Sequence, residues 1–235
     1  MARPVAATHQ FQVHDGTNPL VRRMREIIQG PGASDAWNKC WEGDITPWDL
    51  GQPTPAVTKL VQSNTLASHG RVLVPGCGGG HDVVEFSTPD RYVVGLDVSG
   101  TALKKAKELY SSAPNAEFFE FVKADFFNWV PTESFDIIFD YVFFCAVHPS
   151  LRSAWAKRMD YYLKPEGELI TLMYLFVLVN ISTSNFLAHA NILAYIQIIT
   201  LKPLGFVITS IEDNQVAVGP RKGIEKIARW KKTAN

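Results

Sequence analysis

Short apolar runs alternate with amphipathic segments along most of the chain. The apolar runs predict strands at Val72–Val74, Tyr92–Asp97, Phe118–Lys123, Phe135–Phe139 and Glu168–Tyr174. Apolar residues at helical spacing predict helices at Asn18–Gln29, Thr54–Gln62, His81–Phe86, Ser99–Tyr110 and Leu151–Leu163. Because strands and helices alternate, the expected fold class is α/β, with a doubly wound, mostly parallel sheet and helices on both faces.

Two further segments carry local signals. Lys164–Gly167 contains a proline and a glycine, and it predicts a turn before the last of these strands. In the C-terminal region we expect a strand and then a basic helix, because the basic residues of Arg221–Lys232 have a spacing that suits one solvated helix face.

The charge balance and the cysteine content of the chain argue against several classes of function. The 235 residues include 23 Lys and Arg and 23 Asp and Glu, so the formal net charge is zero. Non-specific attraction to nucleic acid or to an anionic membrane is therefore not expected. The three cysteines lack the spacing of a zinc site, and Met1–Gln10 lacks the features of a secretory signal. We expect a cytoplasmic protein without a metal ion.

A glycine-rich stretch follows the first predicted strand. Pro75-Gly76-Cys77-Gly78-Gly79-Gly80 comes directly after Val72–Val74, and the next strand ends at Asp97. Glycines let the backbone approach a ligand, and the acidic side chain can accept hydrogen bonds from ribose hydroxyls. The pattern indicates a Rossmann-like nucleotide-binding unit. His81 stands where a dinucleotide fingerprint has its third glycine, which favours S-adenosylmethionine over NAD and disfavours an NAD-dependent oxidoreductase.

Candidate ligand groups also follow the later strands. Asp125 and Phe126 come after the third strand, and Asp140 and Tyr141 come at the end of the fourth. Ligands of such sheets bind outside the carboxyl ends of the strands. A carboxylate there can accept from an adenine amino group, and an aromatic ring can cover the base. Several consecutive strands are thus followed by side chains that could bind one nucleoside-containing ligand.

Three tryptophans, Trp37, Trp41 and Trp48, lie close together before the first strand. They either pack in the core or form an N-terminal helical lid over the ligand. The face of a tryptophan ring attracts positive charge, so the second alternative suits a cationic sulfonium.

Together the motifs resemble the class I S-adenosylmethionine-dependent methyltransferases, and more narrowly the plant thiol and halide methyltransferases of the thiopurine methyltransferase group. The resemblance runs from about Trp37 to Tyr174 and resumes at Leu204. It is carried by Trp37-x-x-x-Trp41, Ile45–Asp49, Leu73–Asp82 and Asp140–Cys145. It implies a single methyltransferase domain with a lid at 1–50, a cofactor-binding core at 66–174, an atypical apolar segment at 175–201 and a C-terminal strand and basic helix at 202–235.

The resemblance also implies a role for each matching residue. The three tryptophans would line and close the cofactor site, and Gly76 would lie against the methionine portion. Asp97 would hold the ribose, while Asp125 and Phe126 would bind adenine. Tyr141 would lie near the reacting methyl group, and Tyr141 and Tyr174 are candidates for positioning the acceptor. The catalytic residues stay unassigned.

The implied reaction is an in-line transfer of the methyl group to a small soft anion: thiocyanate, bisulfide, a thiolate or a halide. The product of the cofactor would be S-adenosylhomocysteine. Such anions need no proton removed, so positioning and desolvation would supply most of the rate. His81, His148 and Cys145 are therefore not expected to act as catalysts. A monomer is the expected state, although the sequence does not decide this.

One segment departs from the family pattern. From Leu169 to Leu201 there is no Asp, Glu, Lys or Arg, and the resemblance stops after Tyr174. The segment is either membrane-spanning, or a buried strand and apolar helix, or a replacement by alternative splicing or a faulty gene model, which its abrupt edges favour. We expect a helix at Asn185–Ile199. Two hypotheses follow: an active small-anion methyltransferase, or an S-adenosylmethionine-binding protein with impaired or no transfer because its acceptor segment is replaced.

Overall fold

The computed structural model describes residues 18–29, 35–174 and 192–233. Its strands form a seven-stranded sheet in the order β3-β2-β1-β4-β5-β7-β6. They are β1 (Gly70–Pro75), β2 (Arg91–Asp97), β3 (Phe119–Lys123), β4 (Phe135–Tyr141), β5 (Leu163–Tyr174), β6 (Phe206–Asp213) and β7 (Glu225–Lys232). The first five strands are parallel, and β7 runs antiparallel between β5 and β6. The predicted doubly wound, mostly parallel α/β sheet is confirmed.

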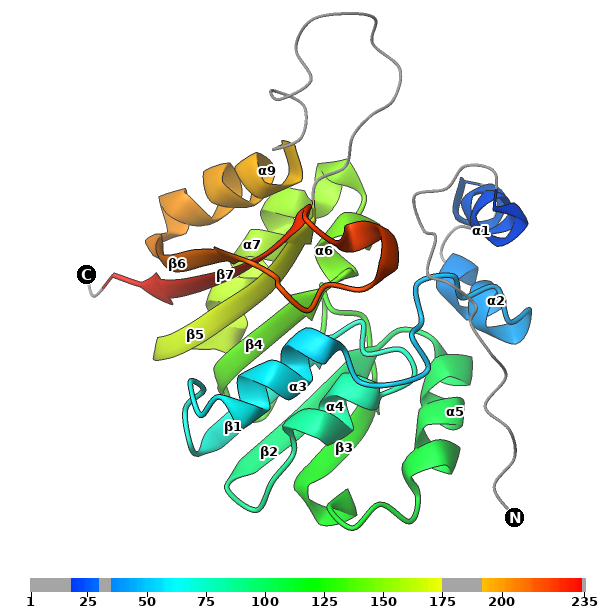
Figure 1. Cartoon of the computed structure of the whole chain (residues 1–235), viewed down its shortest axis with the longest axis horizontal. Coiled ribbons are helices and arrows are strands. Elements are labelled where there is room, and N and C mark those ends of the chain that lie inside the picture. Colours follow the sequence, from blue (N-terminus) through cyan, green and yellow to red (C-terminus); the bar gives the residue numbers. More distant parts are fainter. Residues whose placement is uncertain (1–17, 30–34, 175–191, 234–235) are drawn as a thin grey trace, which may run out of the picture.

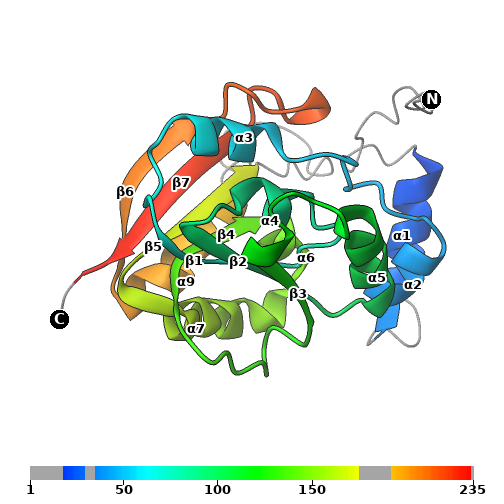
Figure 2. The same ribbon diagram turned by 90° about the horizontal axis from the view of Figure 1, so that it is seen from below.

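Helices cover both faces of the sheet (Figures 1 and 2). One face carries α3 (Pro55–Gln62), α4 (His81–Phe86) and α5 (Gly100–Tyr110). The other carries α6 (Phe143–Ala146), α7 (Arg152–Tyr162) and α9 (Ile192–Leu201). At the N-terminal end, α1 (Pro19–Gln29) packs on α2 (Ala36–Glu42), and α2 packs on α5 (Figure 1). Short 3₁₀ turns lie at Ala116–Phe118, Pro149–Leu151, Lys202–Leu204 and Gly219–Arg221.

The central strands are apolar because both of their faces are buried. In β1, Val72 and Val74 contribute to the core under α3 and α4, whereas Leu73 points into the core under α7. In β4, Ile137 and Ile138 divide between the same two cores. Strands that are buried on both faces have continuous apolar sequences. The apolar runs therefore predict the positions of the central strands correctly.

Two of the predicted helices begin with a clear local cause. Ser99 caps α5, because its Oγ accepts a hydrogen bond from the Ala102 amide at 3.1 Å. Pro55 begins α3, where its missing N–H removes no helical hydrogen bond.

The predicted turn at Lys164–Gly167 is wrong. These residues belong to β5, and the pairing with β4 shifts between Phe135↔Leu163 and Ile137↔Glu168, so they form an irregular bulge within the strand. A bulge accommodates a proline and a glycine without ending the strand. The Lys164 Nζ donates to Asp136 Oδ2 at 2.8 Å, which fastens the bulge to β4.

The predicted basic C-terminal helix is also wrong, because the segment forms β7. Ala228 and Trp230 are buried at a spacing of two, and Trp230 Nε1 donates to Thr171 Oγ1 of β5 at 3.0 Å. Pairing with strands on both sides outweighs the helical spacing of the basic residues.

The helix expected at Asn185–Ile199 is found in part. The structure places α9 at Ile192–Leu201, so the helix ends two residues later than expected. Residues 185–191 lie outside the described residues. Among the helices that the structure describes, none is both long and apolar enough to cross a membrane.

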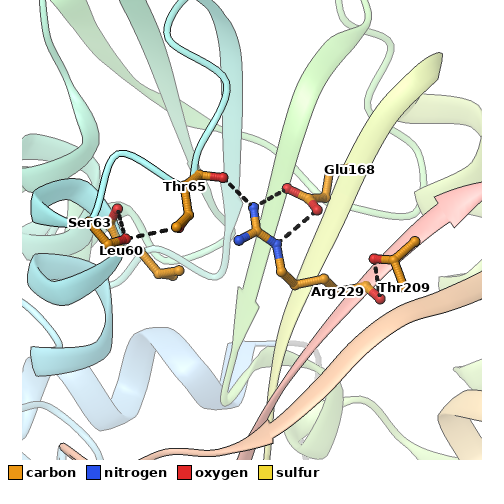
Figure 3. Close-up of polar contacts among 6 residues, drawn as sticks. All are labelled: Leu60, Ser63, Thr65, Glu168, Thr209 and Arg229. Atoms are coloured by element: carbon orange, nitrogen blue, oxygen red, sulfur yellow. Dashed lines mark hydrogen bonds and ion pairs between the residues drawn. The ribbon is translucent and has the colours of Figure 1, made fainter.

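An arginine joins β7 to the rest of the sheet. Arg229 Nε and Nη2 donate to the two oxygens of Glu168 on β5 at 2.9 and 2.6 Å, and Nη2 also donates to the Thr65 carbonyl at 2.7 Å (Figure 3). The two side chains are 18% and 14% exposed, so the pair is mostly shielded from water. Such bidentate pairs fix geometry as well as adding energy.

Replacing Arg229 by Met should lower the free energy of unfolding by about 1–3 kcal/mol, because Glu168 then keeps a shielded charge without its donor. Urea unfolding measures this. The control is Lys226→Met, which breaks a pair with Asp213 whose side chains are 37% and 62% exposed. That loss should be below about 1 kcal/mol. Equal losses in the two variants would contradict a special role for the Arg229 pair.

Candidate active site

A cleft lies at the carboxyl ends of β1 and β4, where the strand order reverses. Its lining includes Trp41, Trp48, Gly76, His81 and Tyr141. The cleft has about 540 Å³ of empty space when its open mouth is included. The reversal point is where open α/β sheets bind ligands. The structure therefore brings residues from the N-terminal region, the glycine loop and β4 to one place.

The glycine loop is shaped by close contacts with aromatic rings. Gly76 and Gly78 have φ values of +63° and +51°, which favour glycine. A Cβ on Gly78 would lie 2.9 Å from Cζ2 of Trp41, and a Cβ on Gly76 would lie 2.6 Å from Cδ2 of Phe143. The loop thus lets both rings pack directly on its backbone, while Gly76 itself stays exposed.

Asp97 holds this loop from the end of β2. Its Oδ2 accepts from the Gly78 amide at 2.9 Å, and its Oδ1 accepts from the Ser99 amide at 2.8 Å. Burial raises the pKa of Asp97, and these backbone hydrogen bonds oppose the shift. Asp97 therefore links the glycine loop to the start of α5. Its role toward a ribose stays a prediction.

The tryptophans form a packed cluster that is also a wall of the cleft. The ring of Trp48 meets those of Trp37 and Trp41 edge to face, with centroids 5.4 and 6.3 Å apart. Trp41 is only 5% exposed. Trp41 and Trp48 line the cleft, and Trp37 contacts Trp48 from outside that lining. The two alternatives for these residues, core packing and ligand wall, are therefore compatible.

The helix that carries Trp37 and Trp41 is fastened to α5. Asn38 Oδ1 accepts from Ser99 Oγ at 3.0 Å and from the Thr101 amide at 3.1 Å. Lys105 Nζ donates to the Trp41 carbonyl at 3.0 Å and lies 5.8 Å from the centroid of its ring. These contacts hold α2 beside the end of β2.

Asp125 and Phe126 lie after β3, outside the cleft lining. Asp125 is exposed, and its carboxylate accepts from the Phe127 amide at 2.9 Å and from Asn128 Nδ2 at 2.6 Å. Phe126 is 4% exposed, and its ring centroid lies 4.8 Å from that of Phe143. Phe143 also touches Gly76, so it connects Phe126 to the glycine loop. The adenine-binding roles of Asp125 and Phe126 stay predictions.

Tyr141 lies in the cleft lining and its ring packs against the arginine of a buried charged pair. Its Oη is buried without a hydrogen-bond partner among the described residues. The guanidinium carbon of Arg221 lies 4.8 Å from the centroid of the Tyr141 ring. Arg221 Nη1 is 3.7 Å from Glu225 Oε2, and both side chains are 1% exposed. Burial lowers the pKa of Arg221 to about 10 although the Glu225 charge opposes this, so the guanidinium stays protonated at neutral pH.

Sequence reasoning missed Arg221 as a site residue and treated it as part of a solvated helix. The available signal was its place in a tail that matches the family pattern. Tyr174, the predicted acceptor-positioning residue, is the last residue of β5 and pairs with Glu225 in the β5–β7 register. The end of β5 and the charged pair are therefore neighbours in the sheet.

Two residues that were not expected to act as catalysts, His148 and Cys145, are not part of the cleft lining. His148 is exposed and its Nδ1 lies 2.7 Å from Ser150 Oγ, while the Cys145 thiol donates to the Val142 carbonyl at 2.9 Å. Within 18–29, 35–174 and 192–233, no group of three or more His, Cys, Asp or Glu residues could hold a metal ion.

Solved structures with this fold include S-adenosylmethionine-dependent methyltransferases. The glycopeptide N-methyltransferase MtfA, solved in complex with S-adenosyl-L-methionine, superposes with a TM-score of 0.62 over 79% of this chain and 96% of its own, at 12% identity. At that identity the likeness concerns the fold. The fold is that of the S-adenosylmethionine-dependent methyltransferases.

Sequence relatives define the family. Residues 32–180 match the thiopurine S-methyltransferase family model. Thiocyanate methyltransferase 1 of Arabidopsis thaliana is 53% identical over 214 residues, covering 91% of this chain and 92% of the relative. The probable thiol methyltransferase 2 of the same plant is 48% identical over 213 residues, again covering 91% and 92%. The chain belongs to the thiopurine S-methyltransferase family and is an S-adenosylmethionine-dependent methyltransferase.

Replacing Gly78 by Ala should destabilise the protein and weaken its affinity for S-adenosylhomocysteine, because the new Cβ displaces Trp41. Left-handed strain alone is expected to lower the free energy of unfolding by about 1–2 kcal/mol. Gly223→Ala is the matched control, since Gly223 has φ +77° but nothing within 4 Å of an added Cβ. Titration calorimetry should show about tenfold weaker binding for Gly78→Ala only. Equal affinities would contradict the contact's role.

Asp140 is buried at the end of β4, where its carboxylate accepts hydrogen bonds from the Phe144 amide at 3.0 Å and from Trp155 Nε1 at 2.9 Å. Burial raises its pKa from 3.8 to about 6. The folded protein therefore holds this proton more tightly than the unfolded chain, and stability falls as pH rises from about 4 to above 6. The Trp155 hydrogen bond favours the charged carboxylate and offsets part of that loss.

Trp155→Phe should thus lower the free energy of unfolding more at pH 8 than at pH 5, by about 1 kcal/mol, because only the charged carboxylate needs the lost donor strongly. The lost ring volume contributes equally at both values. Urea unfolding at each pH measures the difference. The same loss at pH 5 and pH 8 would show that Trp155 acts through packing alone.

Proposed function

We propose that this protein transfers the methyl group of S-adenosylmethionine to small soft nucleophiles, by in-line displacement and with release of S-adenosylhomocysteine. The acceptor class comprises thiocyanate, bisulfide, thiols and halides. Two plant relatives are named for thiocyanate and thiol substrates, which supports this class. The structural observation that carries the proposal is the protonated Arg221 packed behind Tyr141 in the wall of the cleft.

The residues around the cleft suit the cofactor. S-adenosylmethionine, when bound, supplies an electrophilic methyl group on a positively charged sulfur. Two carboxylates, Asp49 and Asp82, and two tryptophan rings line the cleft, and both kinds of group attract a cation. Gly76 is exposed and lies in the cleft lining, so the methionine portion of the cofactor would lie against its backbone.

The remaining cofactor roles follow the family pattern. Trp37, Trp41 and Trp48 form the closing wall, and Asp97 holds the ribose at the end of β2. Asp125 and Phe126 hold adenine after β3. Tyr141 lies near the reacting methyl group, and Tyr141 and Tyr174 position the acceptor.

Arg221 favours an anionic acceptor on the other side of Tyr141. A guanidinium shielded from water acts through a low dielectric, so its field is stronger than that of an exposed cation. Glu225 helps to keep it charged, and the guanidinium is the end of the pair that lies on the Tyr141 ring. An anion drawn to this wall loses part of its hydration and is aligned with the methyl group. No general base is needed for an acceptor that reacts as an anion, and a thiol would react as its thiolate after losing its proton to solvent.

Purified protein incubated with methyl-labelled S-adenosylmethionine and thiocyanate, bisulfide or iodide should form a labelled methylated product with each acceptor. The alternative hypothesis is a cofactor-binding protein with impaired or no transfer, which the uncharged run from Leu169 to Leu201 motivates. Cofactor binding without product for any of the three anions would favour that alternative.

A charge-balanced variant tests Arg221. Arg221→Met with Glu225→Gln removes both buried charges, which avoids leaving one unpaired. We expect kcat/KM for thiocyanate to fall about 100-fold while S-adenosylhomocysteine affinity is retained. Arg91→Met is the control, because Arg91 is 8% exposed but begins β2, at the opposite end of the sheet. Similar kcat/KM for the double variant and the unaltered protein would overturn the role of Arg221.

A further inference from the structure

His81 lies in the cleft lining, but its two ring nitrogens face protein groups. Nδ1 is 2.6 Å from the Tyr110 hydroxyl of α5, and Nε2 is 3.5 Å from Asp49 Oδ1. Asp49 directly follows Trp48, and His81 is the first residue of α4. The imidazole therefore links the tryptophan wall to the start of α4. The side chain of His81 is 12% exposed, which shields these contacts from water.

The chemistry of the partners places the protons. An ionised carboxylate only accepts hydrogen bonds, so Nε2 carries the proton that faces Asp49. In a neutral ring Nδ1 is then the acceptor, and the Tyr110 hydroxyl donates to it. Burial raises the pKa of Tyr110, and the nearby Asp49 charge adds to the shift, which keeps this hydroxyl protonated. Tyr110 therefore selects the tautomer that presents Nε2–H to Asp49.

Asp49 is held in its ionised form. Burial by itself would raise its pKa, but hydrogen bonds from His81 and the Gly51 amide, together with the nearby Lys105 charge, bring the pKa below its ordinary value. Its Oδ1 accepts from the Gly51 amide at 3.0 Å, which also closes the turn after Trp48.

The same segment is fastened a second time. Asp82, the residue after His81, accepts from the Thr54 amide at 2.7 Å and from the Thr54 hydroxyl at 2.8 Å. The segment 49–54 is thus tied at both ends to the first turn of α4. It also touches the glycine loop, because a Cβ on Gly79 would lie 3.0 Å from His81 Nε2 and 3.4 Å from Asp49 Oδ2.

We propose that His81 is a positioning residue for the cofactor cleft. Through Asp49 it fixes Trp48 at its place opposite the glycine loop, so that the cleft exists before a ligand enters. Binding then needs less ordering of the tryptophan wall, and affinity is higher. The proposal rests on the proposed function in taking this cleft as the cofactor site. It assigns His81 no part in the chemical step.

Two substitutions separate the contacts of the ring. Glutamine places an amide N–H near the position of Nε2, so His81→Gln retains a donor to Asp49. Asparagine places its oxygen near the position of Nδ1, so His81→Asn retains only the acceptor for Tyr110. His69→Gln is the matched control, because His69 is exposed and contacts only the neighbouring Ser68 hydroxyl among its described hydrogen bonds.

Titration calorimetry with S-adenosylhomocysteine, and steady-state kinetics with thiocyanate, provide the readouts. For His81→Asn we expect about tenfold weaker binding and a correspondingly higher KM for S-adenosylmethionine, with kcat at saturation retained. His81→Gln and His69→Gln should bind as the unaltered protein does. Thermal unfolding without ligand checks that each variant is folded.

The outcomes distinguish this proposal from the proposed function. If the unaltered protein binds no S-adenosylhomocysteine, the cleft is not the cofactor site and both fail. If it binds, but His81→Asn binds equally well, only the positioning role is overturned. Equal loss of affinity in the Asn and Gln variants also overturns it, because the ring would then act by packing and not through Asp49.

Discussion

The direct packing of aromatic rings on the glycine loop is the contact on which the rest of the cleft depends. Trp41 from α2 meets Gly78, and Phe143 from α6 meets Gly76, at distances that leave no room for a Cβ. Asp97 holds the loop from the opposite side through the Gly78 amide. The N-terminal wall, the end of β2 and the segment after β4 therefore share one reference point. A side chain at either glycine would separate these parts by more than packed interiors tolerate.

The second constraint is the antiparallel strand β7 between β5 and β6. Because β7 begins beside Tyr174 and runs back along β5, the residues before it, including Arg221, reach the carboxyl edge of the sheet. The Arg229–Glu168 pair fixes this strand at its other end. The C-terminal region thereby supplies a buried cation next to Tyr141, from the turn at Gly219–Arg221 that precedes β7.

Local patterns predicted the elements whose burial is determined by their own sequence. The boundaries of α4 and the cap at Ser99 followed from spacing and capping chemistry, and the central strands followed from their apolar runs. The bulge at Lys164–Gly167 and the strand β7 depend on pairing with distant strands, which a local window does not contain. Arg221 was missed for the same reason, since its burial comes from contact with Tyr141, eighty positions earlier in the chain. The sequence pattern assigned His81 no role, and its contact with Asp49, thirty-two positions earlier, becomes visible only in the fold.

The charges around the cleft are separated in a way that suits the proposed reaction. Asp49 and Asp82 lie on the side of the glycine loop and α4, whereas the Arg221 guanidinium lies behind Tyr141. A cationic sulfonium gains from the first side and an anionic acceptor from the second, so the two reactants are drawn to opposite walls with the methyl group between them. After transfer both products have lost the charge that each wall attracts. An arrangement that attracts the charged reactants would therefore attract the uncharged groups of the products less strongly.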